Sequence, residues 1–426
     1  MTIAHLGSKT GQQGGPAGYL AQLARAFGAY GTADHVVALP PRGPSPALAP
    51  VQPSANSAAQ QWLRRVRSSV AGPPTFYRPS TADINTPGGK VDELMSGSWS
   101  AMQADVAASV ATAVAANTEV LFAHDAAAAE TALAQRQPHQ QVWLFLHTPM
   151  PIALYLTWCW GVPERDWQEV AQLPDVLSWN ARELDVIGRV DKVLMPCPES
   201  VDELVKGDRR FATALSRVEF LMTGAAAPPR QWPDLSRTEL RQRCGLPAAE
   251  PVGLYIGNAQ PYRGFDRLLD ALRAMPSRTD VPGIVAVAGP AIDTLPLISR
   301  VKALGPVGHI ADLLAASDFV INVNRFSLFD LSTIEALDLG CPLVLHAGGG
   351  NLTFQRLGAG AAMIPDLAAR SIADALTVAF QWTDAERAAR AAASRHCYDE
   401  HLSLRHLRDR HVALYDSSAM HVAVQG

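Results

Sequence analysis

Residues Asn322–Asn351 read NVNRFSLFDLSTIEALDLGCPLVLHAGGGN, and the rest of the chain can be placed around them. An apolar strand, residues 318–321, leads into this segment, and a helix is predicted to begin near Ser332. A second apolar strand, Pro342 to His346, ends in three glycines. Two strands joined by one helix form a βαβ unit whose turns meet at the carboxyl edge of a parallel sheet. Ligands bind at that edge, and the helix amino terminus offers free N–H groups to a phosphate.

Glu335 lies in the first turn of this helix, where it can contact whatever the phosphate carries. The letters Ser332-Thr333-Ile334-Glu335 also form a capping-box pattern, in which the glutamate folds back onto the serine backbone and has no further role. Both interpretations fit the segment taken alone.

The composition is that of a globular protein with room for two cores. The chain has 426 residues, of which 48% are apolar and 18% charged. Its net charge of -4 disfavours a nucleic-acid partner. Five cysteines without a C-x-x-C pair indicate neither a disulfide framework nor a zinc site. Because the sequence also lacks a signal-peptide pattern and a membrane-length apolar run, we predict a cytoplasmic protein.

The first lobe is predicted to cover residues 1–225 and to begin with a strand, Thr2 to Leu6, a glycine-rich loop and a helix from about Ala17 to Phe27. The loop glycines, among them Gly14 and Gly15, permit close approach of a ligand to the backbone, or serve only to make the turn. Their spacing fits neither the dinucleotide pattern nor the P-loop, which disfavours a nicotinamide dehydrogenase.

Two strands of this lobe end in histidine. Val120 to Ala123 leads to His124, and Val142 to Leu146 leads to His147, 23 residues later. Parallel strands would bring both side chains to the same rim of the sheet. The prolines in His147-Thr148-Pro149-Met150-Pro151 would stiffen the loop that holds the imidazole. Each histidine alone could also be an ordinary hydrogen-bonded loop residue.

A proline-rich stretch, residues 224–234, marks the passage to a second lobe, predicted over residues 226–400. There, strand Val252 to Ile256 is followed by a polar loop and by helix Phe265 to Ala274. Arg263 stands just before this helix, where its guanidinium and the helix N–H groups could share one phosphate. A solvated surface arginine is the alternative. The last segment, residues 401–426, is predicted to be helical and could cross back to the first lobe.

The pattern strand-GN-x4-RG-helix, followed by the βαβ segment and GGGN, resembles the retaining glycosyltransferases of GT-B fold, and family 4 most of all. The resemblance covers most of residues 250–365 and implies an α/β protein with two Rossmann-like, doubly wound parallel sheets facing a cleft. In that family a basic pair holds the donor diphosphate. Arg263 takes the position of its lysine, while Asn258 stands where the family has arginine.

The family also carries E-x7-E, whose second glutamate binds the donor ribose and matches Glu335. The first glutamate, which faces the transferred sugar, falls on Ser327, and Asp330 in the same loop is our candidate substitute. Phe329, Leu331 and Ser332 complete the matched donor loop.

In the first lobe, Gly14-Gly15 matches the loop under the donor phosphates. His124-Asp125 and the His147 segment are similar to elements of the trehalose-phosphate synthases, another GT-B family, in which the matching histidine lies at the donor sugar.

The resemblance implies a retaining transfer of sugar from a nucleoside diphosphate sugar to a saccharide, lipid-linked or small-molecule acceptor, with peripheral membrane contact in the lipid-linked case. His147, Asp330 and Arg263 are the predicted catalytic residues, and no cofactor or metal is expected. Two alternatives remain, a nucleotide-sugar epimerase or isomerase and a non-catalytic nucleotide-sugar binding protein. The sequence does not determine the oligomeric state.

Overall fold

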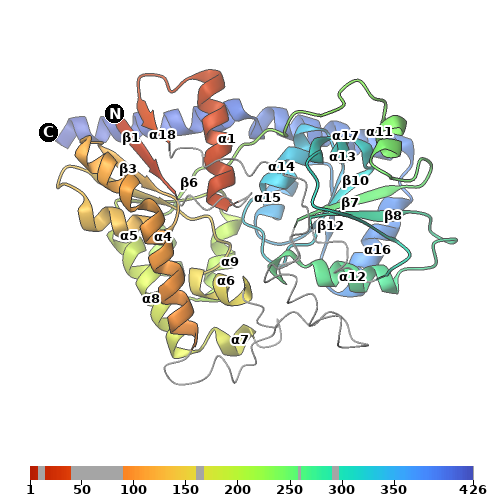
Figure 1. Cartoon of the computed structure of the whole chain (residues 1–426), viewed down its shortest axis with the longest axis horizontal. Coiled ribbons are helices and arrows are strands. Elements are labelled where there is room, and N and C mark those ends of the chain that lie inside the picture. Colours follow the sequence, from red (N-terminus) through yellow and green to blue (C-terminus); the bar gives the residue numbers. More distant parts are fainter. Residues whose placement is uncertain (8–14, 40–89, 160–166, 258–260, 290–296, 426) are drawn as a thin grey trace, which may run out of the picture.

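Two parallel six-stranded sheets form the framework of the computed structural model, which describes residues 1–7, 15–39, 90–159, 167–257, 261–289 and 297–425. The first sheet has the order β2-β1-β3-β4-β5-β6 and the second the order β12-β11-β10-β7-β8-β9. All neighbouring strands are parallel. Figure 1 shows the sheets in two lobes that lie side by side. The prediction of two doubly wound parallel sheets is therefore confirmed.

The strands are short, as is usual for parallel sheets covered on both faces. The first sheet contains β1 (Thr2–Leu6), β2 (Val36–Ala38), β3 (Val120–Ala123), β4 (Gln141–Phe145), β5 (Lys192–Met195) and β6 (Glu219–Phe220). The second contains β7 (Val252–Ile256), β8 (Ile284–Ala288), β9 (Val301–Gly305), β10 (Phe319–Asn322), β11 (Leu343–His346) and β12 (Ala361–Ile364).

Helices cover both faces of the first sheet. The helical elements of this lobe are α1 (Gly15–Tyr30), α4 (Lys90–Ala115), α5 (Ala126–Gln135), α6 (Ile152–Cys159), α7 (Trp167–Val170), α8 (Pro174–Arg189), α9 (Glu199–Gly207), α10 (Phe211–Ala214) and η2 (Leu215–Arg217). One core cluster joins α4, α5, α6 and α8 to one face, and a second joins α1 to the other. Every side chain of β3 is buried, as expected for a strand covered on both faces.

The second lobe follows the same plan. Its helical elements are α11 (Arg237–Arg243), η3 (Pro261–Arg263), α12 (Phe265–Ala274), α13 (Ile310–Ala316), α14 (Leu331–Asp338), α15 (Gly350–Arg356), α16 (Ala369–Phe380), α17 (Asp384–Cys397) and the π-helical turn η5 (Tyr398–Leu402). One core cluster lies under α12 and α16, and another under α13 and α14.

The final helix, α18 (Leu404–Gln425), packs on the first lobe although it follows the second in sequence (Figure 1). Leu407, Leu414 and Tyr415 share a buried cluster with Ile3 and Tyr19. The chain therefore completes the core of its first lobe with residues from its opposite end.

The segment between the lobes is held by carboxylates of the second lobe. Asp312, at 0% exposure, accepts hydrogen bonds from the backbone N–H groups of Gln231 and Trp232, at 2.8 and 3.3 Å. It also pairs with the Arg230 guanidinium at 3.3 Å. Three donors on one buried carboxylate fix the course of the chain as it enters the second lobe.

The predicted bounds of β1, β3, β7 and α12 agree with the structure to the residue. Among the elements that had not been predicted are β9, β12 and α8. Among the helices of the described residues, none combines the length and the apolar character needed to cross a bilayer.

Candidate functional site

Each sheet has one switch point. The chain leaves one of the two strands there toward one edge of the sheet and leaves its neighbour toward the opposite edge. In the first sheet this switch point lies between β1 and β3, and in the second between β7 and β10. Loops diverge there and leave a crevice beyond the strand ends, which is where open α/β sheets bind ligands. Arg263, Asp330 and Glu335 come from the segments after β7 and β10, and His124 from the segment after β3.

The Asp330 carboxylate binds four side chains around the loop that follows β10. Its Oδ2 accepts hydrogen bonds from the side-chain amides of Asn322 and Asn324 at 3.1 and 2.9 Å, and from the Ser327 hydroxyl at 2.8 Å. Its Oδ1 pairs with the Arg263 guanidinium at 3.1 Å. Both carboxylate oxygens are therefore engaged within the protein.

Arg263 is held beside the Asp330 carboxylate and does not point into bulk solvent, since its side chain is 23% exposed. Its guanidinium also lies over the ring of Tyr262, 5.2 Å from the centroid. The next residue, Gly264, has φ 64°, and a Cβ there would lie 2.0 Å from the Val323 carbonyl oxygen. Only glycine permits this approach of the loop to β10, and it is what brings Arg263 to Asp330.

Glu335 does not cap its own helix, so the capping-box interpretation is wrong. The N-cap of α14 is Asp330, and it makes no side-chain capping bond. The Oε1 of Glu335 instead accepts a hydrogen bond from the Gln22 amide of α1, in the other lobe, at 3.3 Å. Burial raises the pKa of Glu335 to about 7, opposed by the nearby Arg25 guanidinium. A carboxylate in this state is half-ionised near neutral pH and faces the first lobe.

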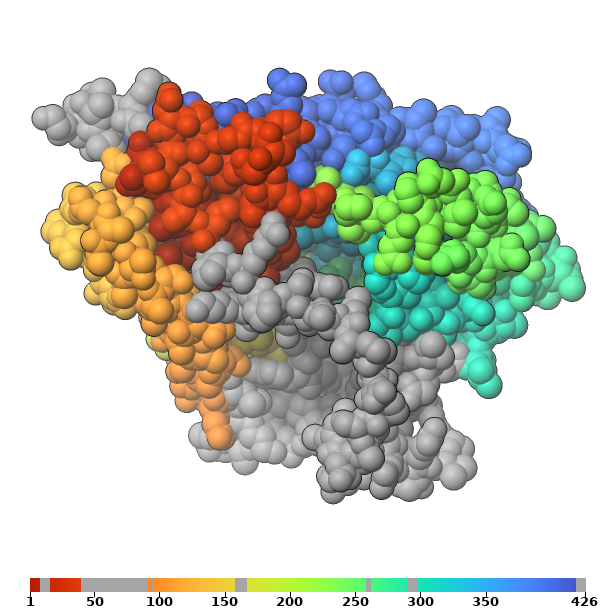
Figure 2. Space-filling model, turned by 45° about the horizontal axis from the view of Figure 1, so that its top comes forward, coloured from red at the N-terminus to blue at the C-terminus, as the bar shows by residue number. Residues whose placement is uncertain are grey.

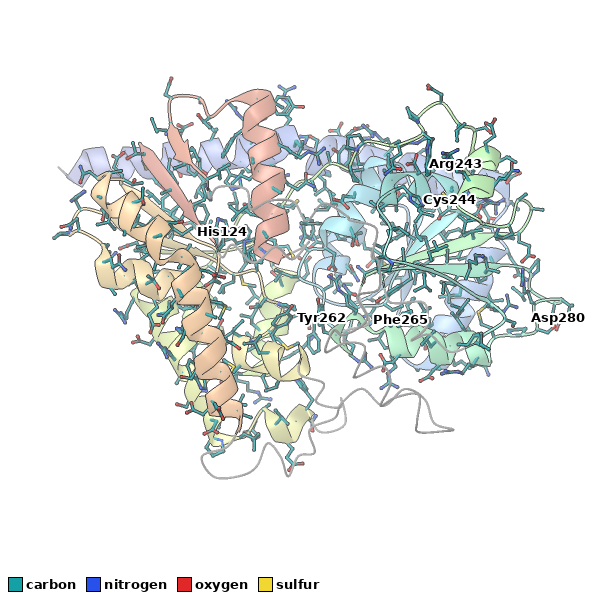
Figure 3. The ribbon with its side chains drawn as sticks, viewed as in Figure 1. His124, Arg243, Cys244, Tyr262, Phe265 and Asp280 are labelled. Atoms are coloured by element: carbon teal, nitrogen blue, oxygen red, sulfur yellow. The ribbon has the colours of Figure 1, made fainter. Side chains whose placement is uncertain are left out.

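The two lobes touch at the amino ends of α1 and α14. A Cβ on Gly18, in the first turn of α1, would lie 2.9 Å from Cδ1 of Leu331, the first residue of α14. The rings of Tyr155 and Tyr262 also meet across the lobes, at 5.4 Å between centroids. In Figure 2 the surface is hollowed between the red atoms of the first lobe and the green and cyan atoms of the second. Figure 3 labels Tyr262 on the side of the second lobe that faces the first.

The two histidines meet at one rim, as predicted. His124 Nδ1 lies 2.9 Å from His147 Nε2. Burial lowers the pKa of His147 to about 3 and that of His124 well below its usual value, so both imidazoles are neutral at physiological pH. Asp125 has a structural role, because its Oδ1 accepts from the Ala128 N–H at 2.7 Å and caps α5.

The remaining predicted site residues occupy varied positions. The ring of Phe329 is buried and stacks on Phe354 at 4.4 Å, so only its backbone can contact a ligand. Ser332 is part-buried in the first turn of α14. Gly15 is the first residue of α1, while Gly14 and Asn258 lie outside the described residues. The donor-binding roles given to these residues stay predictions.

The loop after His147 is anchored by a second buried carboxylate. Glu183 of α8, 1% exposed, accepts a hydrogen bond from the Ile152 N–H at the start of α6, at 2.8 Å. Burial raises its pKa from 4.5 to about 7. Pro151 packs against Gly207 of α9, because a Cβ on Gly207 would lie 2.7 Å from the Pro151 Cδ.

Glu183→Gln is expected to stabilise the protein at pH 8 and to have little effect at pH 4. The folded-state pKa lies above the unfolded one, so ionisation opposes folding, and the penalty grows as pH rises from 4.5 to about 7. Glutamine keeps an acceptor for Ile152 and removes a penalty of roughly 3 kcal/mol. Urea unfolding at both pH values measures the change, with Glu93→Gln on the exposed side of α4 as control. An equal change at both pH values would contradict this role.

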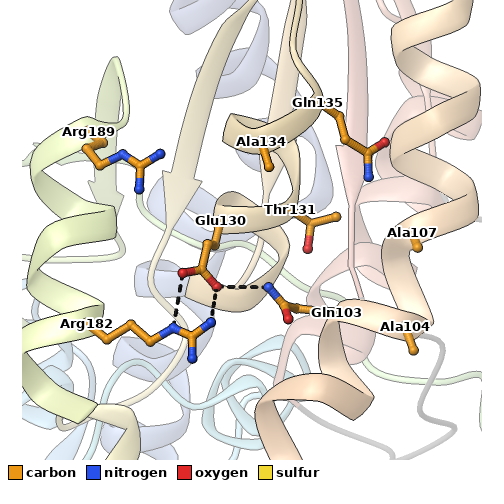
Figure 4. Close-up of a pocket in the computed structure, with 9 residues that line it drawn as sticks. All are labelled: Gln103, Ala104, Ala107, Glu130, Thr131, Ala134, Gln135, Arg182 and Arg189. Carbon is orange, nitrogen blue, oxygen red and sulfur yellow. Dashed lines mark hydrogen bonds and ion pairs between the residues drawn. The ribbon is translucent and has the colours of Figure 1, made fainter. Parts of the chain in front are cut away.

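Of two cavities among the described residues, one is lined by predicted site residues and the other is not. A space of about 10 Å³ at the second switch point holds roughly one water. It is lined by Tyr255, Ile256, Arg263, Val320, Ile321, Asn322, Asn324, Ser332 and Thr333. The other, about 540 Å³, lies on α4, α5 and α8 of the first lobe and contains none of the predicted site residues (Figure 4). Its Glu130 is already bound by Arg182, Gln103 and Trp99.

Within the part of the chain that the structure describes, no group of three or more histidine, cysteine, aspartate or glutamate side chains is arranged to hold a metal ion. The expectation that the protein needs no metal or cofactor stays a prediction.

Some residues near the site were not identified from the sequence. His5 could have been, because it is the one imidazole within the apolar strand β1. Gln22 could not, since a single glutamine on a helix carries no pattern that predicts a contact with the other lobe. Asn322 and Asn324 had a weak signal, as polar residues at the end of a buried strand.

Comparison with known proteins first defines the class of the chain. Its fold matches HepE from Anabaena, solved with UDP-glucose, with a TM-score of 0.61 and 18% identity over 98% of this chain and 100% of that one. It also matches sucrose-phosphate synthase from Thermosynechococcus elongatus, with a TM-score of 0.65 and 17% identity over 99% of both chains. The chain has the two-lobed GT-B fold.

The sequence of the second lobe also matches a known family. Residues 250–381 match the family described as glycosyl transferases group 1. D-inositol 3-phosphate glycosyltransferase from Xylanimonas cellulosilytica is 28% identical over 183 residues, which are 39% of this chain and 43% of that protein. Mannosylfructose-phosphate synthase from Agrobacterium fabrum is 26% identical over 230 residues, 48% of each. The matches span less than half the length of these relatives. The resemblance to GT-B glycosyltransferases is confirmed, for the fold over the whole chain and for the family over residues 250–381.

Proposed function

We propose that this protein is a glycosyltransferase that moves a sugar from a nucleoside diphosphate sugar to a hydroxyl acceptor, with retention of anomeric configuration. The observation that carries the proposal is the contact of Gly18 with Leu331. The helices α1 and α14 each follow a switch-point strand, and their amino ends converge on one place between the lobes. Two helix amino termini offer N–H groups and positive dipole ends to a diphosphate.

Sugar transfer requires stabilisation of the charge that develops on the departing diphosphate. Arg263 supplies a positive group already oriented by Asp330, so little reorganisation is needed as the glycosidic bond lengthens. The first N–H groups of α14, near Leu331 and Ser332, add donors that the helix itself leaves free. These groups act without a metal.

Glu335 is proposed to accept hydrogen bonds from the ribose hydroxyls. It lies one turn along α14 from the proposed phosphate position, and its present partner is the Gln22 amide at 3.3 Å. A neutral amide at that distance is readily replaced by hydroxyl donors. His147, at the rim of the other sheet, is proposed to hydrogen-bond the donor sugar or its phosphate. The acceptor would then attack from the leaving-group face.

The names of two relatives contain a phosphorylated small molecule, inositol 3-phosphate in one and mannosylfructose phosphate in the other. We propose a small hydroxylated acceptor of this kind ahead of a glycan or a lipid-linked one, with the protein in the cytoplasm. The acceptor side lies in the first lobe.

A thermal-shift screen of nucleoside diphosphates and their sugars tests the donor site. A ligand at 100 times its Kd raises the free energy of unfolding by about 2.7 kcal/mol. Product analysis follows, first with the donor alone and then with phosphorylated and free sugars or polyols. Transfer to an acceptor supports the proposal. A rearranged donor without acceptor identifies an epimerase, and tight binding without any product identifies a binding protein.

Two variants distinguish Asp330 as the anchor of Arg263 from Asp330 as the carboxylate that faces the transferred sugar. Asp330→Asn presents one oxygen and one amide to four donors, so Arg263 loses its anchor. We expect donor affinity to fall about tenfold. Ser327→Ala leaves three of the four donors and should change affinity less than threefold. A loss of kcat in Asp330→Asn with unchanged donor affinity would instead assign Asp330 to the sugar.

A further inference from the structure

A continuous line of hydrogen bonds runs behind His147 into the first lobe. His147 Nε2 lies 2.9 Å from His124 Nδ1, and His124 Nε2 lies 2.9 Å from His5 Nδ1. His5 Nε2 lies 2.9 Å from the Tyr415 hydroxyl of α18. We call these four residues the histidine relay. Figure 3 shows where His124 lies within the first lobe.

The relay is dry and its rings are held in place. The exposed fractions of His5, His124 and Tyr415 are 2%, 0% and 0%. The Phe122 ring stacks on His5 at 4.6 Å and on His124 at 5.1 Å. His5 and His124 form hydrogen bonds through both ring nitrogens, and His147 forms one through Nε2. None of the three rings can therefore rotate without losing a hydrogen bond.

Burial keeps the relay uncharged. The pKa values of His5 and His124 lie well below the usual value for histidine, and burial raises the pKa of the Tyr415 phenol well above 10. A neutral imidazole has one N–H donor and one acceptor, so the relay can be ordered in only two directions.

Tyr415 decides between these directions. Among the described residues, its oxygen has a single hydrogen-bond partner, His5 Nε2. If His5 donated to it, the phenol hydrogen would be buried without an acceptor, which is unfavourable. Tyr415 therefore donates. His5 Nδ1–H then donates to His124 Nε2, and His124 Nδ1–H donates to His147 Nε2. The remaining hydrogen of neutral His147 must sit on Nδ1.

We propose that Tyr415, His5 and His124 are positioning residues that fix His147 as the Nδ1–H tautomer, so that His147 presents a hydrogen-bond donor to the ligand. Within the described residues Nδ1 has no protein partner, and His147 is part-exposed. Its partner is thus an acceptor atom, a phosphate or sugar oxygen. His147 cannot take a proton from an incoming hydroxyl, because Nε2 is occupied and Nδ1 already carries hydrogen.

Histidine-selective 15N labelling of the whole protein measures the tautomers directly. In two-bond 1H–15N spectra, assigned with single histidine variants, we expect His5, His124 and His147 to carry hydrogen on Nδ1. Tyr415→Phe removes the terminal donor and should give a mixture of tautomers at His147. Unprotonated Nδ1 at His147 in the wild type would overturn the proposal. So would a Tyr415→Phe spectrum identical to that of the wild type.

Tyr19→Phe is the matched control. Tyr19 is 1% exposed, and its hydroxyl lies 2.7 Å from His411 Nε2 in the same buried cluster. His411 Nδ1 faces the Leu407 carbonyl at 2.8 Å and must donate to it, so Tyr19 also donates to a histidine, but outside the relay. Tyr19→Phe should leave the His147 tautomer unchanged. A change as large as that of Tyr415→Phe would show a general packing effect and overturn the relay.

The identity of the ligand rests on the proposed function, whereas the tautomer does not. UDP-glucose titration should show affinity about two- to tenfold lower for Tyr415→Phe and unchanged for Tyr19→Phe, as expected for one impaired hydrogen bond. If no nucleoside diphosphate sugar binds the wild type, the proposed function fails while the 15N result still decides the relay. Equal affinities of wild type and Tyr415→Phe, with a changed tautomer, would overturn the claim that this hydrogen contacts the ligand.

Discussion

Arg263→Ala is expected to lower kcat/KM for sugar transfer by about 100- to 1000-fold, the usual effect of removing one preorganised group that stabilises developing charge. The loss should be large because the guanidinium is already aligned by the Asp330 carboxylate at 3.1 Å. It is also the one cation of the predicted phosphate clamp, since the sequence has Asn258 at the second position. Folding should persist, because Asp330 keeps its bonds to Asn322 and Asn324.

The matched control for this variant is Arg273→Ala. Arg273 lies at the other end of α12, is 47% exposed and pairs with Asp270. The same charge is removed, but from the last turn of α12 and not from η3 just before it, and activity should stay within twofold. Arg263→Lys should be intermediate, since lysine keeps the charge and loses the planar fork. Activity of Arg263→Ala within twofold of wild type, with the correct donor, would remove Arg263 from the site.

Glu335→Gln is expected to weaken donor binding and to stabilise the free protein at pH 8. A hydrogen bond to a charged group contributes about 1.5–3 kcal/mol, so affinity should fall by about 10- to 100-fold. Burial raises the pKa of this carboxyl to about 7, so its ionisation opposes folding as pH rises from 4.5 to that value. Glutamine removes the charge and keeps an acceptor for Gln22.

The pH dependence gives a second measure of Glu335. Ribose hydroxyls bind the ionised carboxylate, so wild-type affinity should rise between pH 6 and 8, and the Gln variant should lose this rise. Calorimetric titration and thermal unfolding of both proteins measure the two effects. Asp374→Asn on the exposed face of α16 is the control and should change neither. A parallel pH profile in wild type and Glu335→Gln would show that another group binds the ribose.

Elements with a strong local signal were predictable. β3 and β7 are uninterrupted apolar runs, and α12 places Phe265, Leu268, Leu269 and Leu272 on one face. The edge strands β9 and β12 were missed because they are only part-buried and β12 is rich in alanine, a poor strand former. In α8 the buried stripe includes Asn180 and Glu183, which interrupt the apolar period.

The site was predictable where it follows strand ends. His124 and His147 were brought together by two strands, and the position of Arg263 beside a helix start was read from glycine and helix spacing. The hydrogen bond between Gln22 and Glu335 joins residues 313 apart, and the one between His5 and Tyr415 joins residues 410 apart. Such contacts depend on the packing of whole lobes, for which a single sequence contains no local pattern.

The packing of α18 on the first lobe bears on how the chain is made. When residues 1–225 have left the ribosome, the sheet face under α1 still lacks Leu407, Leu414 and Tyr415, which lie in α18, beyond the whole second lobe. Nascent chains usually complete their amino-terminal domain first. Here that half would wait, with apolar surface exposed and His5 without its phenol partner, until α18 has been synthesised. A stop codon before residue 404 should therefore unfold the beginning of the protein as well as remove its end.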